Sequence, residues 1–564
     1  MALGLQPSRP DNCLNVRRNI ILTIREGADL MRLERWITDL HLGRLHHRVD
    51  LFFCLSAFVV IVSLLLGGSA HGRFPANSLL QFAAIPLLLV ALWRISETSL
   101  PKEVWVPLAF CAALALLPLL QLIPLPPFLW TALPNRGPSE EAFVLSGQST
   151  PWMPISVTPQ ETWLCFLALI APIAIFLATL LLSYRERRWL TLVVLAVGTL
   201  SVFVGLVQVA QGPNSPLRFY EITNPTEAVG FFANRNHFAA LLYVLLSIAA
   251  AWVVNTNMNI GNLRAGEIHL GSLIAVIAGF TLLVILLAGE AMARSRAGLT
   301  LTIVALFGAF ALSFTDRRMR SGVTLNKVLL AAVSLSVIFA VQFALNRISE
   351  RFDADPGFRL DYAKHTIDAA KAYMPVGSGL GSFVPVYALY ETAADTFPDT
   401  YVNHAHNDIL EFWLEAGIFS LALIACFAIW FAFRAVQIWQ SPPRRAGALD
   451  WSLARAATLT VPLMIAHSFV DYPLRTGAMA AMFAFACGLM INPLVTVEEP
   501  SAPRVEDRRK RRHKPRPQVP AEPLHTSPST AQWRSNVNWP EEWTKNSKAS
   551  EKLTSPSDPS DNTS

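Results

Sequence analysis

Charged residues are scarce in this chain. Asp, Glu, Lys and Arg make up 15% of its 564 residues, whereas hydrophobic residues make up 53%. Soluble proteins carry charge on about a quarter of their residues, so this deficit excludes a soluble enzyme, and the apolar content excludes a disordered scaffold. The six cysteines include no CxxC or other paired spacing, so the sequence indicates neither a disulfide framework nor a zinc site.

The positive charge of the chain is unevenly distributed. The formal net charge is +6, which by itself is compatible with a nucleic-acid partner. The basic residues, however, flank apolar runs and fill one tail, and this distribution is typical of the way in which membrane proteins are oriented. We therefore expect contact with membrane lipid and no nucleic-acid partner.

Long apolar runs dominate the rest of the sequence. A bilayer core about 30 Å thick needs roughly 20 mostly apolar residues per helix, and twelve runs of about that length occur. They predict an all-α, polytopic membrane protein with about 12 transmembrane helices. The runs cover 51–67, 79–95, 104–124, 162–183, 189–210, 237–254, 270–290, 298–315, 327–345, 416–436, 453–470 and 477–496.

Basic segments between these runs predict the topology. Residues 1–49 carry several arginines but no apolar region with a cleavage site, so the first run is expected to act as an uncleaved anchor. With this end of the chain in the cytoplasm, the basic loops around Arg185, Arg317 and Arg444 also lie inside, in agreement with the positive-inside rule.

Three parts follow from this topology. They are a basic cytoplasmic arm at 1–49, a multi-span membrane domain at 50–497 and a cytoplasmic tail at 498–564. The tail is rich in Pro, Ser and charge and contains the basic run Arg508–Arg512, so we predict that it is disordered and contacts anionic lipid. The outward side carries longer segments, among them a large periplasmic loop at about 346–415.

The large outward loop shows patterns of ordered structure. An amphipathic stretch runs from Arg359 to Tyr373 and is followed by the glycine-rich run Val376–Phe383. This run lacks the Gly-Lys-Ser/Thr ending of a P-loop, so we expect tight turns between short helices. The aromatic side chains of the loop are compatible with stacking on sugar rings and equally with a small core; they are Tyr362, Tyr373, Phe383, Tyr387, Tyr390, Phe397 and Tyr401.

The segment from His404 to Gly417 places polar residues directly before an apolar run. A histidine at the membrane surface can be neutral near pH 7 and take a proton from a hydroxyl nucleophile. Alternatively, Asn407 or Asp408 caps the next helix and the histidines only solvate the loop, and spacing alone favours this second interpretation. Asp408, Glu411 and Glu415 lie on one helix face, which we expect to point to water or a cavity rather than to lipid.

Two arginines lie between apolar runs on the outward side. Arg294 and Arg296 are compatible with anchors that snorkel at the ends of spans. Their guanidinium groups also suit a phosphate or pyrophosphate, and Arg359 in the large loop allows the same two interpretations. Together with a nearby histidine, such arginines describe a site that holds a lipid-linked pyrophosphate while a hydroxyl attacks.

Two further polar segments adjoin apolar runs. Gly230–Phe238 predicts an ordered turn that caps a helix where the chain enters lipid. His467–Arg475 contains Ser, His and Asp, which raises the question of a hydrolase triad. Ser468 is adjacent to its supposed base and lacks a Gly-x-Ser-x-Gly elbow, so a structural polar cluster is favoured.

Together these segments resemble the O-antigen ligase and O-antigen polymerase superfamily of bacterial membrane glycosyltransferases. The resemblance covers roughly 150–480, with a core at about 225–480, and it depends on the order of the motifs and their placement on one side. The matching motifs are Gly230–Phe238, Ser295–Gly298, Arg359 with Gly377–Gly381, and His406–Gly417. Two further elements are similar to segments of the same group, His467–Pro473 and Pro154–Pro159.

The resemblance implies a multi-span enzyme of the GT-C type in the bacterial inner membrane, with its active site facing the periplasm. Its donor is expected to be an undecaprenyl-pyrophosphate-linked glycan. Arg296 and Arg359 match the family's outward arginines and are expected to bind the donor pyrophosphate. His406 matches the loop histidine and is expected to act as general base on the acceptor hydroxyl or to position it. Direct displacement implies inversion, and no metal or other cofactor is expected.

The resemblance leaves the acceptor open. A ligase transfers the glycan to a lipid A core, whereas an O-antigen or exopolysaccharide polymerase transfers it to a second lipid-linked glycan. A transporter or flippase of lipid-linked glycans is the alternative from another class, but the nearly charge-free centres of the runs favour a surface-facing site. Further substrate contacts are expected from polar residues of the outward segments, namely Asn234, Arg294, His404, Asn407, Glu411, Asp471 and Arg475.

Overall fold

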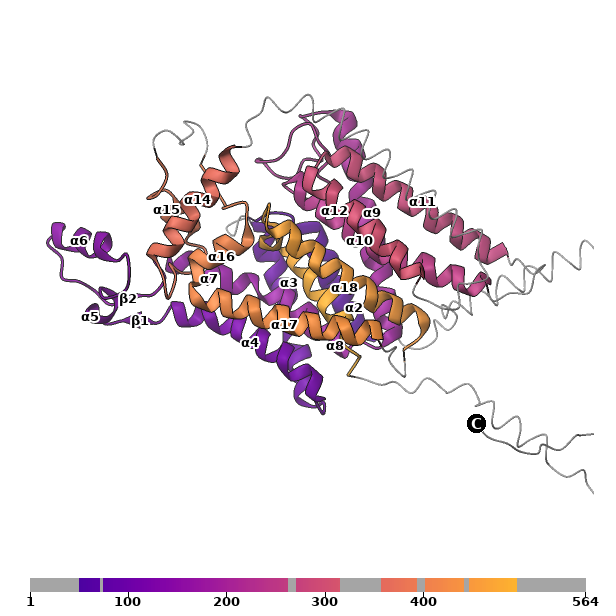
Figure 1. Ribbon diagram of the computed structural model, residues 1–564, viewed down its shortest axis with the longest axis horizontal. Helices are drawn as coiled ribbons and strands as arrows, with labels where there is room; N and C mark the ends of the chain where they lie inside the picture. Colours follow the sequence, from indigo (N-terminus) through magenta and orange to yellow (C-terminus); the bar gives the residue numbers. More distant parts are fainter. Residues whose placement is uncertain are drawn as a thin grey trace, which may run out of the picture. The chain divides into compact units, whose positions relative to one another are not determined.

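The computed structural model describes residues 50–70, 75–261, 270–314, 357–392, 401–440 and 446–494. The expected N-terminal arm, the apolar run at 327–345 and the expected C-terminal tail therefore lie outside the described residues. Within the described ranges the chain is mostly helical (Figure 1), as the all-α prediction requires.

Long helices occupy the apolar runs that the structure describes. Eleven of the twelve runs coincide with helices, and the twelfth is the run at 327–345. The helices are α2 (Leu51–Leu66), α3 (Pro75–Ser96), α4 (Lys102–Gln121), α7 (Pro159–Ala168), α8 (Ile170–Leu181), α9 (Tyr184–Gln211), α10 (Arg235–Gly261), α11 (Leu270–Ala293), α12 (Arg296–Phe314), α17 (Ile418–Gln440), α18 (Ala448–Ser468) and α19 (Gly477–Leu489).

Fewer helices than expected meet the requirements for a membrane span. Six of the described helical segments are long and apolar enough to cross a bilayer: Pro75–Ser96, Lys102–Gln121, Pro159–Leu181, Tyr184–Gln211, Arg235–Asn255 and Ile418–Gln440. Several other apolar helices are shorter; α2, for example, has 16 residues. The prediction of about 12 spans is therefore not confirmed, whereas a multi-pass membrane protein is supported.

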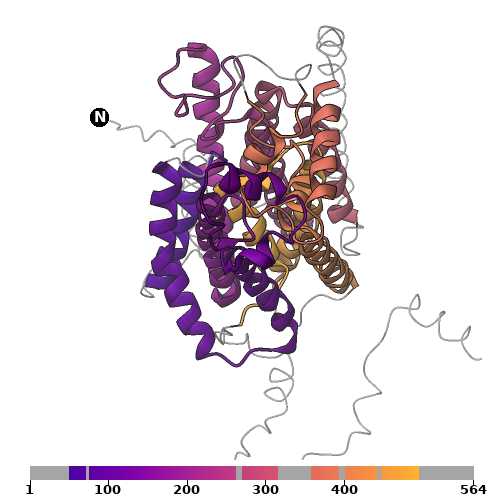
Figure 2. The ribbon, with the colours of Figure 1, turned by 90° about the vertical axis from the view of Figure 1, so that its left-hand side faces the viewer.

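Short elements lie between the long helices at one end of the bundle, which faces the viewer in Figure 2. In β1 and β2, Pro124 pairs with Pro154 and Leu125 with Met153 in an antiparallel register. The short elements are β1 (Pro124–Leu125), α5 (Pro127–Trp130), α6 (Gly137–Leu145), β2 (Met153–Pro154), α14 (Gly357–Ala372), α15 (Phe383–Tyr387), α16 (Asp408–Ala416) and the 3₁₀ turn η2 (Pro473–Arg475).

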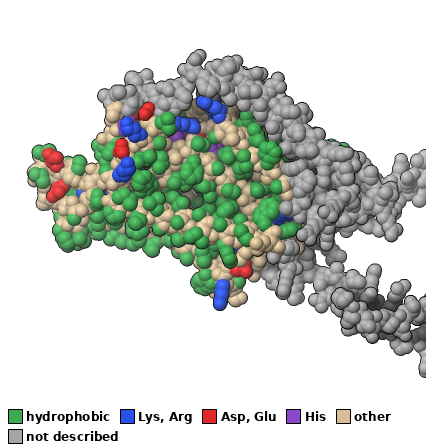
Figure 3. All heavy atoms as spheres, in the orientation of Figure 1, with side chains coloured by type: hydrophobic (Ala, Val, Ile, Leu, Met, Phe, Trp, Pro, Cys, Tyr) green, Lys and Arg blue, Asp and Glu red, His purple; other side chains and the backbone are tan. Residues whose placement is uncertain are grey.

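Helix α10 lies at the centre of the bundle and packs against α11, α12 and α18. In its most apolar stretch 89% of the residues are buried, compared with 6% for α17. A helix that is apolar all round is stable only where it is surrounded by protein or lipid. Thus α10 forms the protein core, whereas α17 presents apolar side chains such as Ile429 and Phe433 outward, and hydrophobic side chains cover much of the face in Figure 3.

The 357–414 region has a small apolar core of its own. Tyr373, Phe383 and Tyr387 are buried there together with Leu414. Of the two roles that the sequence left open for the aromatic residues, these three therefore have the packing role. Tyr362 packs at the edge of this core and is only partly buried.

The glycine-rich run turns tightly, as the sequence predicts. Gly377, Gly379 and Gly381 all have positive φ angles. A Cβ atom on Gly377 would lie 2.5 Å from the carbonyl oxygen of Glu415, and one on Gly379 would lie 2.4 Å from Oγ of Ser156. The glycines are required by close approach, because the run lies between the end of α16 and the segment that leads into α7.

Candidate functional site

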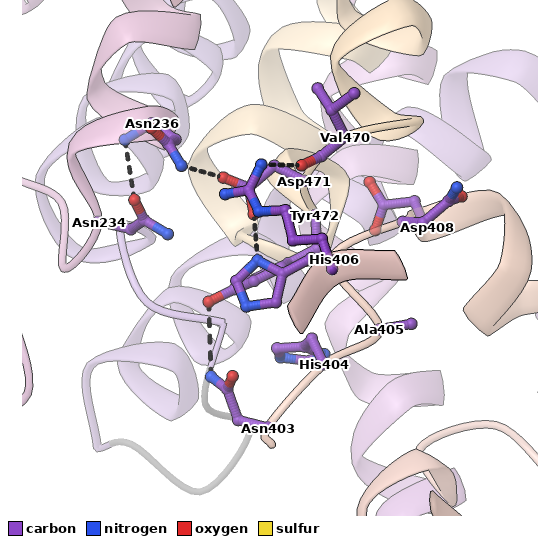
Figure 4. Close-up of polar contacts among 12 residues, drawn as sticks. Asn234, Asn236, Asn403, His404, Ala405, His406, Asp408, Val470, Asp471 and Tyr472 are labelled. Atoms are coloured by element: carbon purple, nitrogen blue, oxygen red, sulfur yellow. Dashed lines mark hydrogen bonds and ion pairs between the residues drawn. The ribbon is translucent and has the colours of Figure 1, made fainter. Parts of the chain in front are cut away.

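Four chain segments meet at the end of the bundle where α10 begins and α18 ends. They are the start of α10, the turn between α11 and α12, the 401–407 loop before α16, and the link between α18 and η2. Figure 4 shows polar side chains from the start of α10, the 401–407 loop and the α18–η2 link around Asp471. The opposite ends of α9 and α18 carry a separate ion pair between Arg188 and Asp450.

His406 and Asp471 form a hydrogen-bonded pair at this end. Nδ1 of His406 lies 3.0 Å from Oδ1 of Asp471. Burial raises the pKa of the Asp471 carboxyl, but the hydrogen bond from His406 and the nearby histidines outweigh burial and hold this pKa below its usual range. An ionised carboxylate only accepts hydrogen bonds, so Nδ1 carries a proton, and in the neutral imidazole the lone pair is on Nε2.

His406 is held in a special backbone conformation. Its φ angle is +49°, a region that residues other than glycine rarely adopt. The imidazole remains 23% exposed, whereas the Asp471 side chain is fully buried. The pair therefore leaves the imidazole accessible and keeps its carboxylate partner inside, an arrangement that is compatible with general-base catalysis.

Asp471 is held from its other side by Asn236. The amide Nδ2 of Asn236 donates to Oδ2 of Asp471, and Oδ1 of Asn236 accepts a hydrogen bond of 2.8 Å from Ser295 Oγ. Ser295 Oγ also accepts from the backbone N–H of Gly298 at 3.1 Å and so caps α12. Asn236 and His406 approach the carboxylate from different sides (Figure 4).

Gly298 allows α12 to approach α10 closely. A Cβ atom at this position would lie 2.4 Å from Cβ of Ala239 on α10. We expect Gly298→Ala to lower the free energy of unfolding of the purified protein by about 1–3 kcal/mol because overpacking forces the helices apart. Adding Ala239→Gly removes the Cβ atom that the new methyl group would meet, and we expect it to restore much of the lost stability. Thermal unfolding measures both variants, and no recovery in the double variant would contradict this explanation.

The three arginines predicted for the site differ in their contacts. Nη1 of Arg359, at the start of α14, donates to the carbonyl oxygen of Val470 at 2.9 Å, beside Asp471. Arg296 is the first residue of α12 and is exposed, and Arg294 precedes it with a φ angle of +51°. Neither Arg294 nor Arg296 forms a side-chain hydrogen bond or ion pair with the described residues, so both remain available for an anion.

Tyr472 links the histidines of the site. Its ring centroid lies 4.3 Å from that of His404, 5.0 Å from that of His406 and 4.9 Å from that of His237. Burial raises the pKa of Tyr472 to about 12, so its hydroxyl keeps its proton at neutral pH. Asn234 forms a hydrogen bond with this tyrosine.

The comparison with known families bears on the class of this site. Residues 281–425 match the family described as O-antigen ligase. This part of the chain is therefore similar to O-antigen ligases, in agreement with the resemblance to the O-antigen ligase and polymerase superfamily that the motifs indicate. No curated protein matches the chain.

The segment that matches the family supplies only part of the site. Arg296, Arg359 and His406 lie within the matched residues, whereas Asn236 and Asp471 lie outside them. The segments on either side of the matched residues therefore contribute the carboxylate and the amide near His406.

The acidic face of α16 lies differently from the sequence-based expectation. Asp408, Glu411 and Glu415 do not point to water or a cavity; all three are buried against Arg475, with N–O distances of 3.6, 3.2 and 2.9 Å. The nearby Arg475 makes burial of these carboxylates possible, because buried charges need partners.

The same cluster holds the loop that carries His404 and His406. Oε1 of Glu411 lies 2.8 Å from Nδ1 of His404, and its Oε2 accepts from the backbone N–H of Ala405 at 2.9 Å. Burial raises the pKa of Glu411, but Arg475 and His404 outweigh it and lower the pKa to about 2. Glu411 and Arg475, which the sequence analysis expected to contact substrate, thus contact each other. Glu411 also holds the loop through His404 and the backbone of Ala405.

Asn407 caps α16. Its Oδ1 accepts from the backbone N–H groups of Ile409 at 3.0 Å and Leu410 at 3.1 Å, and its Nδ2 donates to the carbonyl oxygen of Phe469 at 3.1 Å. The capping interpretation of this segment therefore applies to Asn407. It does not exclude a role for His406, because the cap fixes the residue that directly follows this histidine.

Asp408 makes stability depend on pH. Burial raises its pKa to about 7 from an ordinary value of 3.8, although Arg475 and a hydrogen bond from Ser468 oppose the shift. Its contribution to stability is therefore complete below pH 3.8 and is lost as the pH rises through about 7. The lowered pKa of Glu411 makes stability depend on pH only in acid, because its contribution is complete above the ordinary value of 4.5 and is lost as the pH falls through about 2.

We expect Asp408→Asn to flatten this dependence. Wild-type thermal stability should decrease between about pH 4 and pH 7, the interval between the ordinary and the raised pKa of Asp408, and the neutral amide of the variant should remove most of that slope. Thermal unfolding of the detergent-solubilised protein at several pH values measures the effect. Equal slopes for wild type and Asp408→Asn would contradict the assignment to this carboxyl.

Sequence reasoning missed several roles in the site. Asn236, Ser295 and Tyr472 were quoted only as parts of motifs, and Asp471 was expected at the substrate rather than at His406. The Asn-x-Asn spacing of residues 234–236 before a helix was the available signal, because the first Asn caps the helix and the second then faces the bundle.

Proposed function

We propose that this chain is an O-antigen ligase-like glycosyltransferase. It transfers a glycan from an undecaprenyl-pyrophosphate-linked donor to an acceptor hydroxyl on the periplasmic face of the inner membrane. The observation that carries the proposal is the His406–Asp471 pair at the end of the bundle that also carries Arg294 and Arg296. Among the residues that the structure describes, none forms a hydrogen bond with Nε2 of His406 or with the side chains of these two arginines.

The chemistry follows from these residues. Nε2 of His406 takes the proton of the acceptor hydroxyl as its oxygen attacks the anomeric carbon of the donor. The bond between that carbon and the pyrophosphate oxygen breaks, so the configuration inverts and undecaprenyl pyrophosphate leaves. Asp471 stabilises the imidazolium that forms, and the proton then passes to water.

Arg296 and Arg359 stabilise the negative charge on the leaving pyrophosphate. Guanidinium groups form paired hydrogen bonds with phosphate oxygens, and in this proposal they supply the positive charge without a metal ion. Arg359 is positioned by the carbonyl oxygen of Val470, and Arg296 by the capped start of α12.

We expect Arg296→Ala to lower the rate of transfer by about 100- to 1,000-fold, the typical cost of removing one well-aimed donor. Arg296→Lys should recover part of the rate, because lysine restores the positive charge but lacks the paired N–H donors of the guanidinium group. Arg185→Ala is the matched control, since this arginine lies at the start of α9, away from the site. A normal rate in Arg296→Ala would remove this arginine from the mechanism.

An O-antigen polymerase would use the same residues and differ in its acceptor, a second lipid-linked glycan. The ligase assignment is tested by offering the purified enzyme a lipid A core and a second lipid-linked glycan in parallel. Transfer to the core supports a ligase, and a ladder of longer lipid-linked chains supports a polymerase.

A further inference from the structure

A continuous chain of side-chain hydrogen bonds joins the arginine turn to His406. It starts at Ser295, between Arg294 and Arg296, and passes through Asn236 to Asp471. Asp471 then binds Nδ1 of His406 at 3.0 Å. Three hydrogen bonds thus connect four side chains from four segments that are far apart in the sequence.

The hydrogen bonds fix the direction of the chain. Ser295 Oγ accepts the backbone N–H of Gly298, so its own proton is free to point to Oδ1 of Asn236. The amide nitrogen of Asn236 must then face Asp471, which as a carboxylate only accepts. Both oxygens of Asp471 are used, one by Asn236 and one by His406.

The arginine turn has little freedom to move independently of this chain. Ser295 is 2% exposed and caps α12, and Gly298 packs against Ala239 of α10. Arg294 has a positive φ angle, which residues other than glycine adopt only where the surroundings hold them. A ligand that draws the arginines toward itself therefore also acts on Ser295 and on the amide of Asn236.

We propose that Asn236 and Ser295 are positioning residues that couple an occupied phosphate site at the arginine turn to the orientation and basicity of His406. This inference rests on the proposed function and adds its regulation: the base is set for proton transfer when a pyrophosphate-bearing donor is bound. Neither residue contacts the reacting atoms.

The sign of the effect follows from the Asp471 carboxylate. Loss of the Asn236 amide leaves Oδ2 of Asp471 without that donor, so the carboxylate holds the proton on the imidazole more strongly. The acidic limb of the pH–rate profile then moves to higher pH. Other charged or titratable groups near the pair remain in place in such a variant; they are Arg359 on α14, His237 on α10, His467 on α18, His404 and Tyr472.

The test compares wild type, Asn236→Ala, Ser295→Ala and Asn236→Gln, with Ser247→Ala as control. Ser247 lies on α10 and donates only to the carbonyl oxygen of Tyr243. We expect a lower kcat and an acidic limb at higher pH in both alanine variants, partial recovery in Asn236→Gln, and wild-type behaviour in the control. Combined with Arg296→Ala, Asn236→Ala should cost roughly 5-fold less than the product of the single effects.

A second readout does not depend on turnover. The rate at which diethyl pyrocarbonate modifies His406 is measured by mass spectrometry with and without inorganic pyrophosphate. We expect pyrophosphate to change this rate in wild type and to have little effect in Asn236→Ala although it still binds.

The outcomes separate the two proposals. An unchanged pH profile together with an unchanged pyrophosphate response in Asn236→Ala would overturn the coupling and leave the proposed function intact. Failure of wild type to bind both pyrophosphate and the lipid-linked donor would overturn the proposed function and the coupling together.

Discussion

His406→Ala is expected to lower glycan transfer by about 100- to 10,000-fold, the usual contribution of a general base. The imidazole of His406 is 23% exposed, its Nδ1 is held by Asp471, and its Nε2 forms no hydrogen bond with the described residues. The alanine variant leaves the acceptor hydroxyl without a base and Asp471 without its partner. Initial rates with a lipid-linked donor measure the loss.

A second variant separates chemistry from folding. His406→Gln keeps a side chain that can donate to Asp471 but has no basic nitrogen, so it should be as inactive as His406→Ala and fold at least as well. Thermal unfolding and size-exclusion profiles like those of wild type establish that the protein is intact. Full activity in either variant would remove His406 from the general-base role.

Arg475→Leu is expected to destabilise the protein by about 3–5 kcal/mol, because it leaves buried carboxylates without their cation. Arg475 contacts Asp408, Glu411 and Glu415, all of which are buried. Since Glu411 also holds His404 and the backbone of Ala405, the loop that carries His406 should lose its position at the same time. Thermal unfolding and the yield of monodisperse protein measure the effect.

Charge removal provides the control for this prediction. Combining Arg475→Leu with Asp408→Asn, Glu411→Gln and Glu415→Gln leaves a neutral cluster, and we expect it to recover much of the lost stability. If the single variant unfolded at the wild-type temperature, or the combined variant were no better than the single one, the cluster would not have the role described.

Local patterns in the sequence were sufficient to predict the positions of the long helices. Eleven apolar runs coincide with described helices, one of them with both α7 and α8, because length and hydropathy alone decide whether a segment is helical in an apolar environment. The glycine-rich run was predicted as tight turns, and its positive φ angles confirm this. The number of spans was not confirmed, because helices such as α2 and α19 are shorter than the runs around them suggested.

Contacts between segments that are distant along the chain could not be predicted from the sequence. His406 and Asp471 are 65 residues apart, and no spacing rule relates a loop before one helix to a link after another. The acidic face of α16 was expected at water because a periodic pattern shows which residues share a face, but not that Arg475 lies opposite them. The motif resemblance named candidate residues for the site, whereas the contacts of those residues could be found only from the fold.

Glycan transfer by the purified protein is the most direct test of the central claim. The enzyme in detergent is given a polyprenyl-pyrophosphate-linked glycan, and a lipid A core and a second lipid-linked glycan are offered as acceptors in parallel reactions, with products sized on a gel. We predict transfer to the lipid A core by wild type and none by His406→Gln. No transfer to either acceptor by wild type that binds the donor, or equal transfer by His406→Gln, would contradict the assignment of this site.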